Sequence, residues 1–264
     1  MDFNLKERVA VVTGASGGLG YETALALAKE GCHLSISSRN QDRIEKAADE
    51  IRIQSGAKVL THVVDMNDGS AIKNKITRTL SEYSKLDIVV ANAGGPPSLG
   101  ICDIEVKHLN TAFDQTFVGA FRLFQESVEA LKLSDQARIV AVTSITAKQP
   151  LPEMALSNCP RAAVHALVKT LSLEYGSLGI TANIVAPGMT ATQRITDLVT
   201  QISKRKGISM HEAMEELAGT IPSKHKLGDP ADFGAIVAFV CSKQASFLNG
   251  QTILVDGGQY TGMP

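Results

Sequence analysis

The sequence has almost no net charge, and this absence excludes several classes of partner. Its 264 residues carry a formal net charge of −1, so they offer no basic surface for nucleic acid or for an anionic membrane. No apolar run approaches the ~20 residues that a membrane-spanning helix requires. The N-terminal segment lacks the successive basic, apolar and small-residue regions of a secretory signal peptide. We therefore expect a cytoplasmic protein that acts on a small molecule, with no nucleic-acid or membrane partner.

The sequence also lacks the residue spacings of a metal site or a disulfide framework. Its four cysteines are widely spaced, at Cys32, Cys102, Cys159 and Cys241. They form no CxxC pair, so reduced and mostly buried thiols are expected. His211-Glu212 begins like a zinc-binding HExxH helix, but Glu215 stands where the second histidine is required. We predict no metal, and we interpret Ser209 and Glu212 as the capping box of a helix.

Short β-rich segments alternate with helical patterns along the whole chain, and no linker or repeat divides them. Strands are expected at 8–13, 33–37, 59–64, 86–91, 138–144, 181–185 and 252–255. Helices are expected at 21–30, 41–55, 71–84, 111–132, 162–175 and 232–242. Continuous apolar strands between helices indicate a parallel sheet covered on both faces. We predict one α/β domain over 1–264, a doubly wound Rossmann sheet of seven parallel strands with helices on both faces.

One stretch, at about 190–226, interrupts this alternation between the sixth strand and the last helix. It is polar and partly helical. Ligands of an open α/β sheet bind at the carboxyl ends of its strands, so an insertion at this place is expected to be a lid over the substrate. Its cationic and methionine side chains would suit an anionic or amphipathic ligand without identifying one. These side chains are Arg194, Lys204, Arg205, Lys206, Met210 and Met214.

The strongest motif is the glycine-rich segment from Thr13 to Gly20, which follows the first strand and opens a helix. Gly14 permits the tight turn, Gly18 lets the backbone approach a pyrophosphate, and Gly20 allows the helix to pack closely on the strand. The free N–H groups of the helix N-terminus face the anion. This placement at the start of a repeated βα pattern predicts a dinucleotide-binding site.

The end of the second strand selects between the two nicotinamide dinucleotides. An acidic residue there would bind the ribose 2′-hydroxyl of NAD(H) and repel a 2′-phosphate. This chain has Ser37, Ser38, Arg39 and Asn40 instead, and Arg39 can form charge-assisted hydrogen bonds with a 2′-phosphate. We therefore predict NADP(H) as the cofactor in preference to NAD(H). The alternative is that Arg39 is an ordinary solvated surface residue.

With these motifs the chain resembles a short-chain dehydrogenase/reductase, close in type to 3-oxoacyl-carrier-protein reductases, over essentially its whole length. Beyond the glycine-rich turn, the resemblance rests on Asp65, Asn92-Ala93-Gly94, Ser144, Asn183, Pro187-Gly188, Asn249-Gly250 and Asp256-Gly257-Gly258. The residues that the turn and the resemblance together assign to the cofactor are Gly14, Ser16, Gly18, Leu19, Gly20, Ser38, Arg39, Asp65, Met66, Asn92, Ala93, Gly94, Arg161, Pro187, Gly188 and Thr190.

The resemblance fails at the chemistry. Members of this family use four catalytic residues: an asparagine, a serine, a tyrosine that gives its proton to the carbonyl oxygen, and a lysine that lowers the pKa of the tyrosine. Ser144 keeps the serine position, but Ser157 stands at the tyrosine position, Arg161 at the lysine position and Thr116 at the asparagine position. We take Ser144, Ser157 and Arg161 as the candidate catalytic residues.

These replacements change what the site can do. A serine hydroxyl is a far weaker acid than a phenol, and an arginine has no proton to relay near neutral pH. Arg161 can still hold ribose hydroxyls and stabilise an oxyanion beside Ser144 and Ser157. Pro160 is unfavourable inside a helix, so we expect the helix to start nearby, with Ser157 or Asn158 as its N-cap. Ser157 therefore has a structural interpretation beside the catalytic one.

Three functions remain open from the sequence. The first is an NADP(H)-dependent oxidoreductase for a carbonyl or alcohol substrate, in which His165, Glu153, Lys148 or water replaces the lost proton donor. The second is a catalytically inactive nucleotide-binding protein, a sensor or a partner subunit, since a fold does not determine its function. The third is a dehydratase or isomerase on the same scaffold. We favour the first, because the lid and the pocket-forming loops are retained.

The resemblance also implies a homo-oligomer, a dimer or a tetramer. The contacts would be made by the helices at 111–132 and 162–175 and by the C-terminal strand. Phe113, Phe117, Phe121, Phe124 and Val128 are expected to lie on one stripe of the first of these helices. Such a stripe fits either a subunit interface or the core of the monomer.

Overall fold

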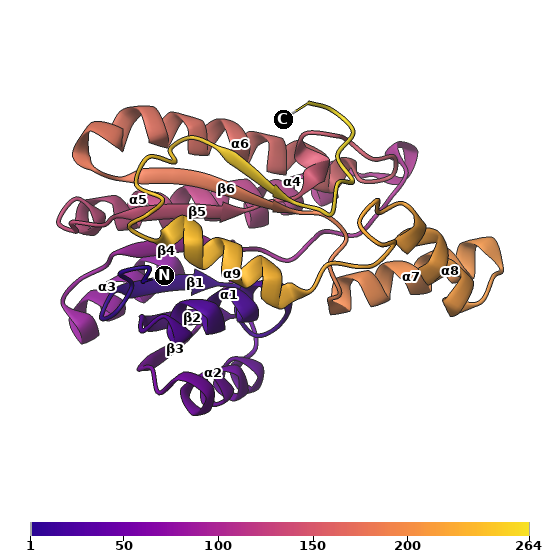
Figure 1. Ribbon diagram of the computed structural model, residues 1–264. Coiled ribbons are helices and arrows are strands. Elements are labelled where there is room, and N and C mark those ends of the chain that lie inside the picture. Colours follow the sequence, from indigo (N-terminus) through magenta and orange to yellow (C-terminus); the bar gives the residue numbers. More distant parts are fainter. Residues whose placement is uncertain (1, 264) are drawn as a thin grey trace.

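The computed structural model describes residues 2–263, which form a sheet of seven parallel strands between two layers of helices (Figure 1). The strand order is β3-β2-β1-β4-β5-β6-β7, which confirms the predicted fold. The strands are β1 (Val9–Thr13), β2 (His33–Ser38), β3 (Val59–Val63), β4 (Ile88–Ala91), β5 (Arg138–Val142), β6 (Thr181–Pro187) and β7 (Thr252–Val255). The order reverses between β1 and β4, and this point is where a doubly wound sheet binds its ligands.

Six of the described helices form two layers, because each buries one apolar face against the sheet. The described helices are α1 (Gly18–Lys29), α2 (Gln41–Ser55), α3 (Gly69–Tyr83), α4 (Val106–Phe113), α5 (Gly119–Leu131), α6 (Ala155–Tyr175), α7 (Gln193–Lys206), α8 (Met210–Gly219) and α9 (Pro230–Cys241). Helices α1, α2 and α9 share one apolar core with the sheet, and α3, α5 and α6 share the other. Strands β1, β4, β5 and β6 are buried on both faces, which explains their continuous apolar sequences.

The long helix expected at 111–132 is not one regular helix. It begins earlier, as α4, and passes through a π-helical turn at Asp114–Val118 before α5. The extra residue in such a turn changes the angle between the residues on its two sides, so Phe113 and Phe117 do not continue the regular spacing of Phe121, Phe124 and Val128. Phe124 and Val128 lie in the core, whereas Phe121 is 41% exposed. Thr116, at the family's asparagine position, lies within this turn.

The N-cap predicted for α6 is also wrong. The helix begins at Ala155, and the backbone N–H groups of Ser157 and Asn158 both donate to the Met154 carbonyl oxygen. The Asn158 side chain donates instead to the Leu151 carbonyl oxygen, 2.9 Å away. Pro160 lies inside the helix near its N-terminus, where its missing N–H removes a single bond. Ser157 is therefore a buried residue of the first turn, and its hydroxyl is free to face the site.

Other expectations have mixed outcomes. The helix at 41–55, the strand at 252–255 and the capping box of Ser209 and Glu212 are confirmed. Only two of the four thiols are buried, those of Cys32 and Cys241. None of the helices described between residues 2 and 263 has the length and apolar composition that crossing a membrane requires.

The segment between β6 and α9 forms α7 and α8, which project from the body of the fold near the carboxyl ends of the strands (Figure 1). These two helices pack on each other through a small apolar cluster of their own, formed around Ile195, Val199, Ala213 and Leu217. This cluster is separate from the two cores that cover the sheet. The segment is therefore attached to the sheet through its ends and through a few polar contacts.

Candidate active site

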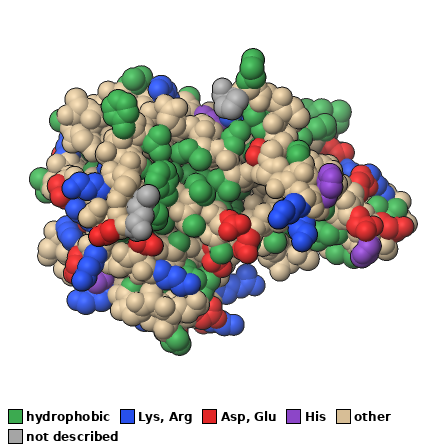
Figure 2. Space-filling model, viewed as in Figure 1, with side chains coloured by type: hydrophobic (Ala, Val, Ile, Leu, Met, Phe, Trp, Pro, Cys, Tyr) green, Lys and Arg blue, Asp and Glu red, His purple; other side chains and the backbone are tan. Residues whose placement is uncertain are grey.

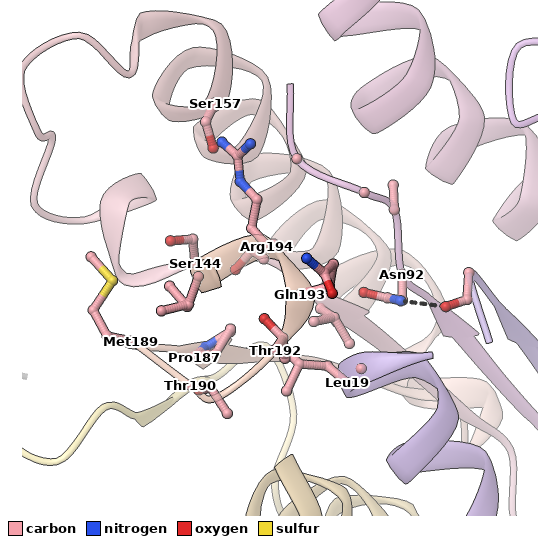
Figure 3. Close-up of a pocket in the computed structure, with 18 of the residues that line it drawn as sticks. Leu19, Asn92, Ser144, Ser157, Pro187, Met189, Thr190, Thr192, Gln193 and Arg194 are labelled. Atoms are coloured by element: carbon pink, nitrogen blue, oxygen red, sulfur yellow. Dashed lines mark hydrogen bonds between the residues drawn. The ribbon is translucent and has the colours of Figure 1, made fainter. Parts of the chain in front are cut away.

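Two adjoining cavities, of about 380 and 270 Å³, lie at the carboxyl ends of the central strands. They share the glycine-rich turn and the segment after β4, so they form one elongated cleft. The larger cavity reaches the ends of β5 and β6 and the start of α6, and residues from the first turns of α7 line it (Figure 3). The smaller one reaches the end of β2. The cleft thus runs between the two ends of the site that the sequence predicts.

The glycine-rich turn is held in a shape that side chains would prevent. Gly14 and Gly18 have φ angles of +60° and +55°, which glycine adopts without strain. A Cβ atom on Gly20 would overlap the Gly14 carbonyl oxygen and approach the Asn92 side chain. That side chain donates from Nδ2 to the Gly14 carbonyl oxygen at 3.2 Å (Figure 3). The turn and the end of β4 are therefore fixed together as a rigid cradle at the N-terminus of α1.

The smaller cavity is cationic at the end of β2. Ser38, Arg39 and Arg43 line it, and Asn40 caps the N-terminus of α2 by accepting from the Arg43 N–H. This cap places Arg43 one turn into the helix and beside Arg39. Asp65 also lines this cavity and accepts from the Asn67 N–H at 3.0 Å. Two guanidinium groups at this end suit a phosphate better than a bare ribose.

Ser144, Ser157 and Arg161 come together in the larger cavity. Ser144 follows β5 and its Oγ accepts from the Thr146 N–H at 3.2 Å. The Ser157 Oγ accepts from Arg161 Nε at 3.1 Å. Because both oxygens act as acceptors in these bonds, both hydroxyl protons remain available to a substrate oxygen.

Arg161 is anchored at the end of β5. Its Nη1 donates to the Thr143 carbonyl oxygen at 2.7 Å and to that of Val142 at 3.4 Å. Its Nη2 forms no hydrogen bond with residues 2–263. Burial, and to a smaller extent the nearby charge of Arg194, lower the pKa of Arg161 to about 10. The side chain therefore remains a cation at neutral pH, and it is only 7% exposed.

None of the three groups proposed to replace the lost proton donor lines either cavity. His165 pairs with the Thr143 hydroxyl at 3.0 Å, and its burial and the nearby cations lower its pKa to about 4. Lys148 lies over the ring of Tyr260, 4.8 Å from its centre. Glu153 pairs with Arg205 of α7. Within residues 2–263, no tyrosine, lysine or histidine side chain lines the cleft.

The structure brings nearly all the predicted cofactor residues to this cleft. Only Gly20 does not line it, and it lies buried beneath the turn. Thr116 lines a narrow void beside Met66 and Asn92 and does not reach the larger cavity. Sequence reasoning missed several residues that line the cleft, among them Arg43, Thr192 and Gln193. It expected Arg194 in the lid but not as a residue of the cavity wall.

Comparison with known proteins agrees with this geometry. The family described as "Enoyl-(Acyl carrier protein) reductase" matches residues 14–260. The chain belongs to the short-chain dehydrogenase/reductase family. This confirms the resemblance found in the sequence and makes the chain a member of a family of oxidoreductase enzymes.

Two relatives of this short-chain dehydrogenase/reductase illustrate the range of similarity. The NADPH-dependent reductase BacG of Bacillus subtilis is 31% identical over 96% of this chain and 98% of its own length. The 3-oxoacyl-[acyl-carrier-protein] reductase FabG of Staphylococcus epidermidis is 29% identical over 95% and 98%. Among solved structures, L-sorbose reductase from Gluconobacter frateurii, complexed with NADPH and L-sorbose, covers 100% of both chains with a TM-score of 0.95 and 27% identity.

Proposed function

We propose that this protein is an NADP(H)-dependent oxidoreductase that interconverts a carbonyl compound and its alcohol with an atypical active site. The supporting observation is the buried guanidinium of Arg161, which is held beside Ser144 and Ser157 with Nη2 unpaired among residues 2–263. A fixed positive charge and two hydroxyl groups thus line the same cavity, and we assign them to the carbonyl oxygen of the substrate. The tyrosine and lysine of the family are replaced by an electrostatic site.

The cleft fits an NADP(H) molecule. The glycine-rich cradle that a Cβ atom on Gly20 would block lies where a diphosphate is expected. Arg39 and Arg43 would hold the 2′-phosphate, and Asp65 lines the same end of the cleft. The relatives named above that are NADPH-dependent or that bind NADPH support the same choice. NAD(H), which lacks the 2′-phosphate, would leave both guanidinium groups without a partner.

The residues of the larger cavity can support reduction without a phenol. The dinucleotide supplies a hydride to the carbonyl carbon when it is bound. Ser144 and Ser157 donate hydrogen bonds to the carbonyl oxygen, and Arg161 stabilises the negative charge that develops on it. A water molecule then supplies the proton that completes the alcohol and leaves as hydroxide. In the oxidation direction the same groups stabilise the alkoxide.

We propose that α7 and α8 form the lid over this cavity. Two contacts support a closed position. The Arg194 Nη2 donates to the Pro96 carbonyl oxygen at 2.7 Å, and Arg205 pairs with Glu153. Both partners belong to loops that border the cleft, so the lid is fastened on two sides. Closure would exclude bulk water and strengthen the electrostatic effect of Arg161.

We also propose that the protein is a homo-oligomer, a dimer or a tetramer. Strand β7 is an edge strand whose residues are all partly exposed, and an unpaired apolar edge usually has a partner. Apolar side chains gather over β7 and α9 on the face shown in Figure 2. Light scattering after size exclusion should give a mass of two or four 28.0 kDa chains. A monomer at assay concentrations would overturn this proposal.

The test of the main proposal is the oxidation of NADPH in the presence of a panel of ketones, aldehydes and 3-oxoacyl thioesters. We expect turnover with at least one class and none without a carbonyl compound. Tight NADPH binding without turnover across the panel would favour the non-catalytic function instead. Conversion of an alkene, a hydroxy compound or an isomer without oxidation of the cofactor would favour a dehydratase or isomerase.

A sharper test restores the family pattern with the double change Ser157→Tyr and Arg161→Lys. If the native site performs the proposed reaction, the parent protein already reduces its ketone substrate and the double variant alters the pH dependence of that rate. If the double variant gains ketone reduction that the parent lacks, the native site does not perform this reaction.

A further inference from the structure

The larger cavity contains a second guanidinium beside Arg161. Arg194 begins in the first turn of α7, and its side chain extends toward Ser157 at the start of α6 rather than toward Leu19 of the glycine-rich turn (Figure 3). Its guanidinium packs on the backbone of Gly95 and donates from Nη2 to the Pro96 carbonyl oxygen. The side chain is therefore held in place by the loop after β4.

The positive charges of this cavity have no compensating carboxylate. Its lining residues within 2–263 include Arg43, Arg161 and Arg194 but no aspartate or glutamate. Neither Arg161 nor Arg194 forms an ion pair with any residue from 2 to 263. A negatively charged ligand of the cavity would supply the partner that these two charges lack among its lining residues.

The unpaired donors of the two arginines are numerous. Arg161 keeps both N–H groups of Nη2, and Arg194 keeps Nε and Nη1, without a hydrogen bond to residues 2–263. Cations in a largely buried site cost free energy unless an anion pairs with them. Their mutual repulsion appears in the pKa of Arg161, which the charge of Arg194 lowers. An anion bound to Arg194 would satisfy its free donors and offset the charge that repels Arg161.

We propose that the substrate carries a carboxylate in addition to its carbonyl group, so that the protein reduces a short oxo acid to a hydroxy acid. This inference rests on the proposed function. The carboxylate binds Arg194, and the carbonyl oxygen binds Ser144, Ser157 and Arg161. Apolar residues line the rest of the cavity and accommodate the carbon chain. They are Ile145, Met154, Met189, Ile195 and Leu198.

The test compares 2-, 3- and 4-oxo carboxylates with their methyl esters, using NADPH as the reductant. Each ester keeps the carbonyl group and removes only the charge. We expect kcat/KM to be at least about tenfold higher for one acid than for its ester, because charge-assisted hydrogen bonds are roughly twice as strong as neutral ones. Equal rates with acids and esters would overturn the proposal.

Arg194→Gln provides the matching variant. It should raise KM for the acid about tenfold more than KM for the ester, because loss of the Pro96 contact affects both substrates alike. It should leave the NADPH dissociation constant unchanged, and Arg194→Lys should restore part of the acid-to-ester discrimination. Lys204→Gln removes an exposed charge from the same helix at a position that does not line the cavity, so this control should change neither the acid-to-ester ratio nor the NADPH affinity. If Arg194→Gln weakens NADPH binding and leaves the acid-to-ester ratio unchanged, Arg194 serves the diphosphate of the cofactor and the proposal falls.

An equilibrium measurement separates this proposal from the proposed function. Titration calorimetry of a 2-hydroxy acid into the complex with NADP⁺ should show binding that Arg194→Gln weakens and Lys204→Gln does not. Binding of this kind without turnover of any oxo acid would support the anion site and overturn the reductase function. Turnover of neutral ketones together with no binding of carboxylates would support the reductase function and overturn the carboxylate site.

Discussion

The two ends of the cleft depend on different parts of the chain: one on backbone conformation and the other on side-chain functional groups. At the glycine-rich turn the features are set by the backbone, since Gly14 and Gly18 have positive φ angles and Gly20 leaves no room for a Cβ atom. At the start of α6 the features are side-chain functional groups, and here Ser157 and Arg161 replace the expected tyrosine and lysine.

Arg161 shows how such an exchange is accommodated. Its guanidinium uses the carbonyl oxygens of Val142 and Thr143 as anchors, groups that belong to the backbone and do not depend on neighbouring side chains. A buried cation is thereby satisfied on one side and open to the cavity on the other. The comparison suggests that cofactor binding and proton transfer can change independently in this fold, and the following experiments address that separation.

The largest effect is expected at the backbone-defined end. Gly20→Ala places a Cβ atom against the Gly14 carbonyl oxygen and the Asn92 side chain, so the cradle must distort. We expect NADPH binding to be lost and the free energy of unfolding to fall by roughly 3 kcal/mol, the upper range for overpacking. Calorimetric titration and urea unfolding measure the two effects. Gly17→Ala, where a Cβ atom meets nothing within 4 Å, should leave stability nearly unchanged, and equal damage there would contradict this account.

The next effect tests the side-chain-defined end. Arg161→Gln removes the charge proposed to stabilise the oxyanion, and we expect kcat to fall about 10²-fold, as for the loss of one electrostatic donor. The NADPH dissociation constant should change less than tenfold. Steady-state assays measure the change in kcat, and fluorescence titration measures the change in NADPH binding. A normal kcat in this variant would remove Arg161 from the chemistry.

The pH dependence of the same residue gives a smaller but diagnostic effect. Because burial lowers the pKa of Arg161 to about 10, its cation is present below that pH and is lost as the pH rises through it. Reduction should therefore fall about tenfold for each pH unit above 10. With an uncharged ketone, Arg194→Gln should move this decline to higher pH, because it removes the charge that adds to the shift. An identical profile in both proteins would assign the decline to another group.

Much of this comparison could be drawn from the sequence alone. The apolar strands, the glycine-rich turn and the absence of an acid after β2 predict the fold and the cofactor end, because backbone conformation and burial leave strong local patterns. Residues brought together from distant segments leave none. Arg43 gives no signal before the Asn40 cap places it beside Arg39, and nothing in the sequence predicts that Arg194 shares a cavity with Arg161.

Two features of the interior were equally invisible. The π-helical turn at Asp114–Val118 depends on how α4 and α5 pack rather than on residue type. Lys75 belongs to a helix that looks amphipathic, yet its amine is fully buried and donates to the Ser37 hydroxyl at 2.8 Å and to the Val12 carbonyl oxygen. Burial holds the pKa of Lys75 well below its usual range. Such a residue reads as a surface lysine until the structure shows otherwise.

A change at the adenosine end should have a tenfold effect without touching the chemistry. Arg39→Gln removes one of the two guanidinium groups at the end of β2, and we expect NADPH to bind about tenfold more weakly, by the strength of one charge-assisted interaction. NADH binding should stay the same. Lys46→Gln, which removes an exposed charge of α2 outside the cleft, is the control. A parallel loss of NADH affinity would mean that Arg39 supports the loop rather than the 2′-phosphate.

The smallest effect concerns the lid. Glu153 and Arg205 are 51% and 56% exposed, and exposed ion pairs contribute less than about 1 kcal/mol because water screens them. Glu153→Gln should therefore change KM by no more than about threefold, and a double-mutant cycle with Arg205→Gln should give a coupling free energy within the same limit. The partly buried contact of Arg194 with Pro96 then carries most of the closure. A coupling free energy above this limit would instead make the ion pair of Glu153 and Arg205 the main contact that holds the lid closed.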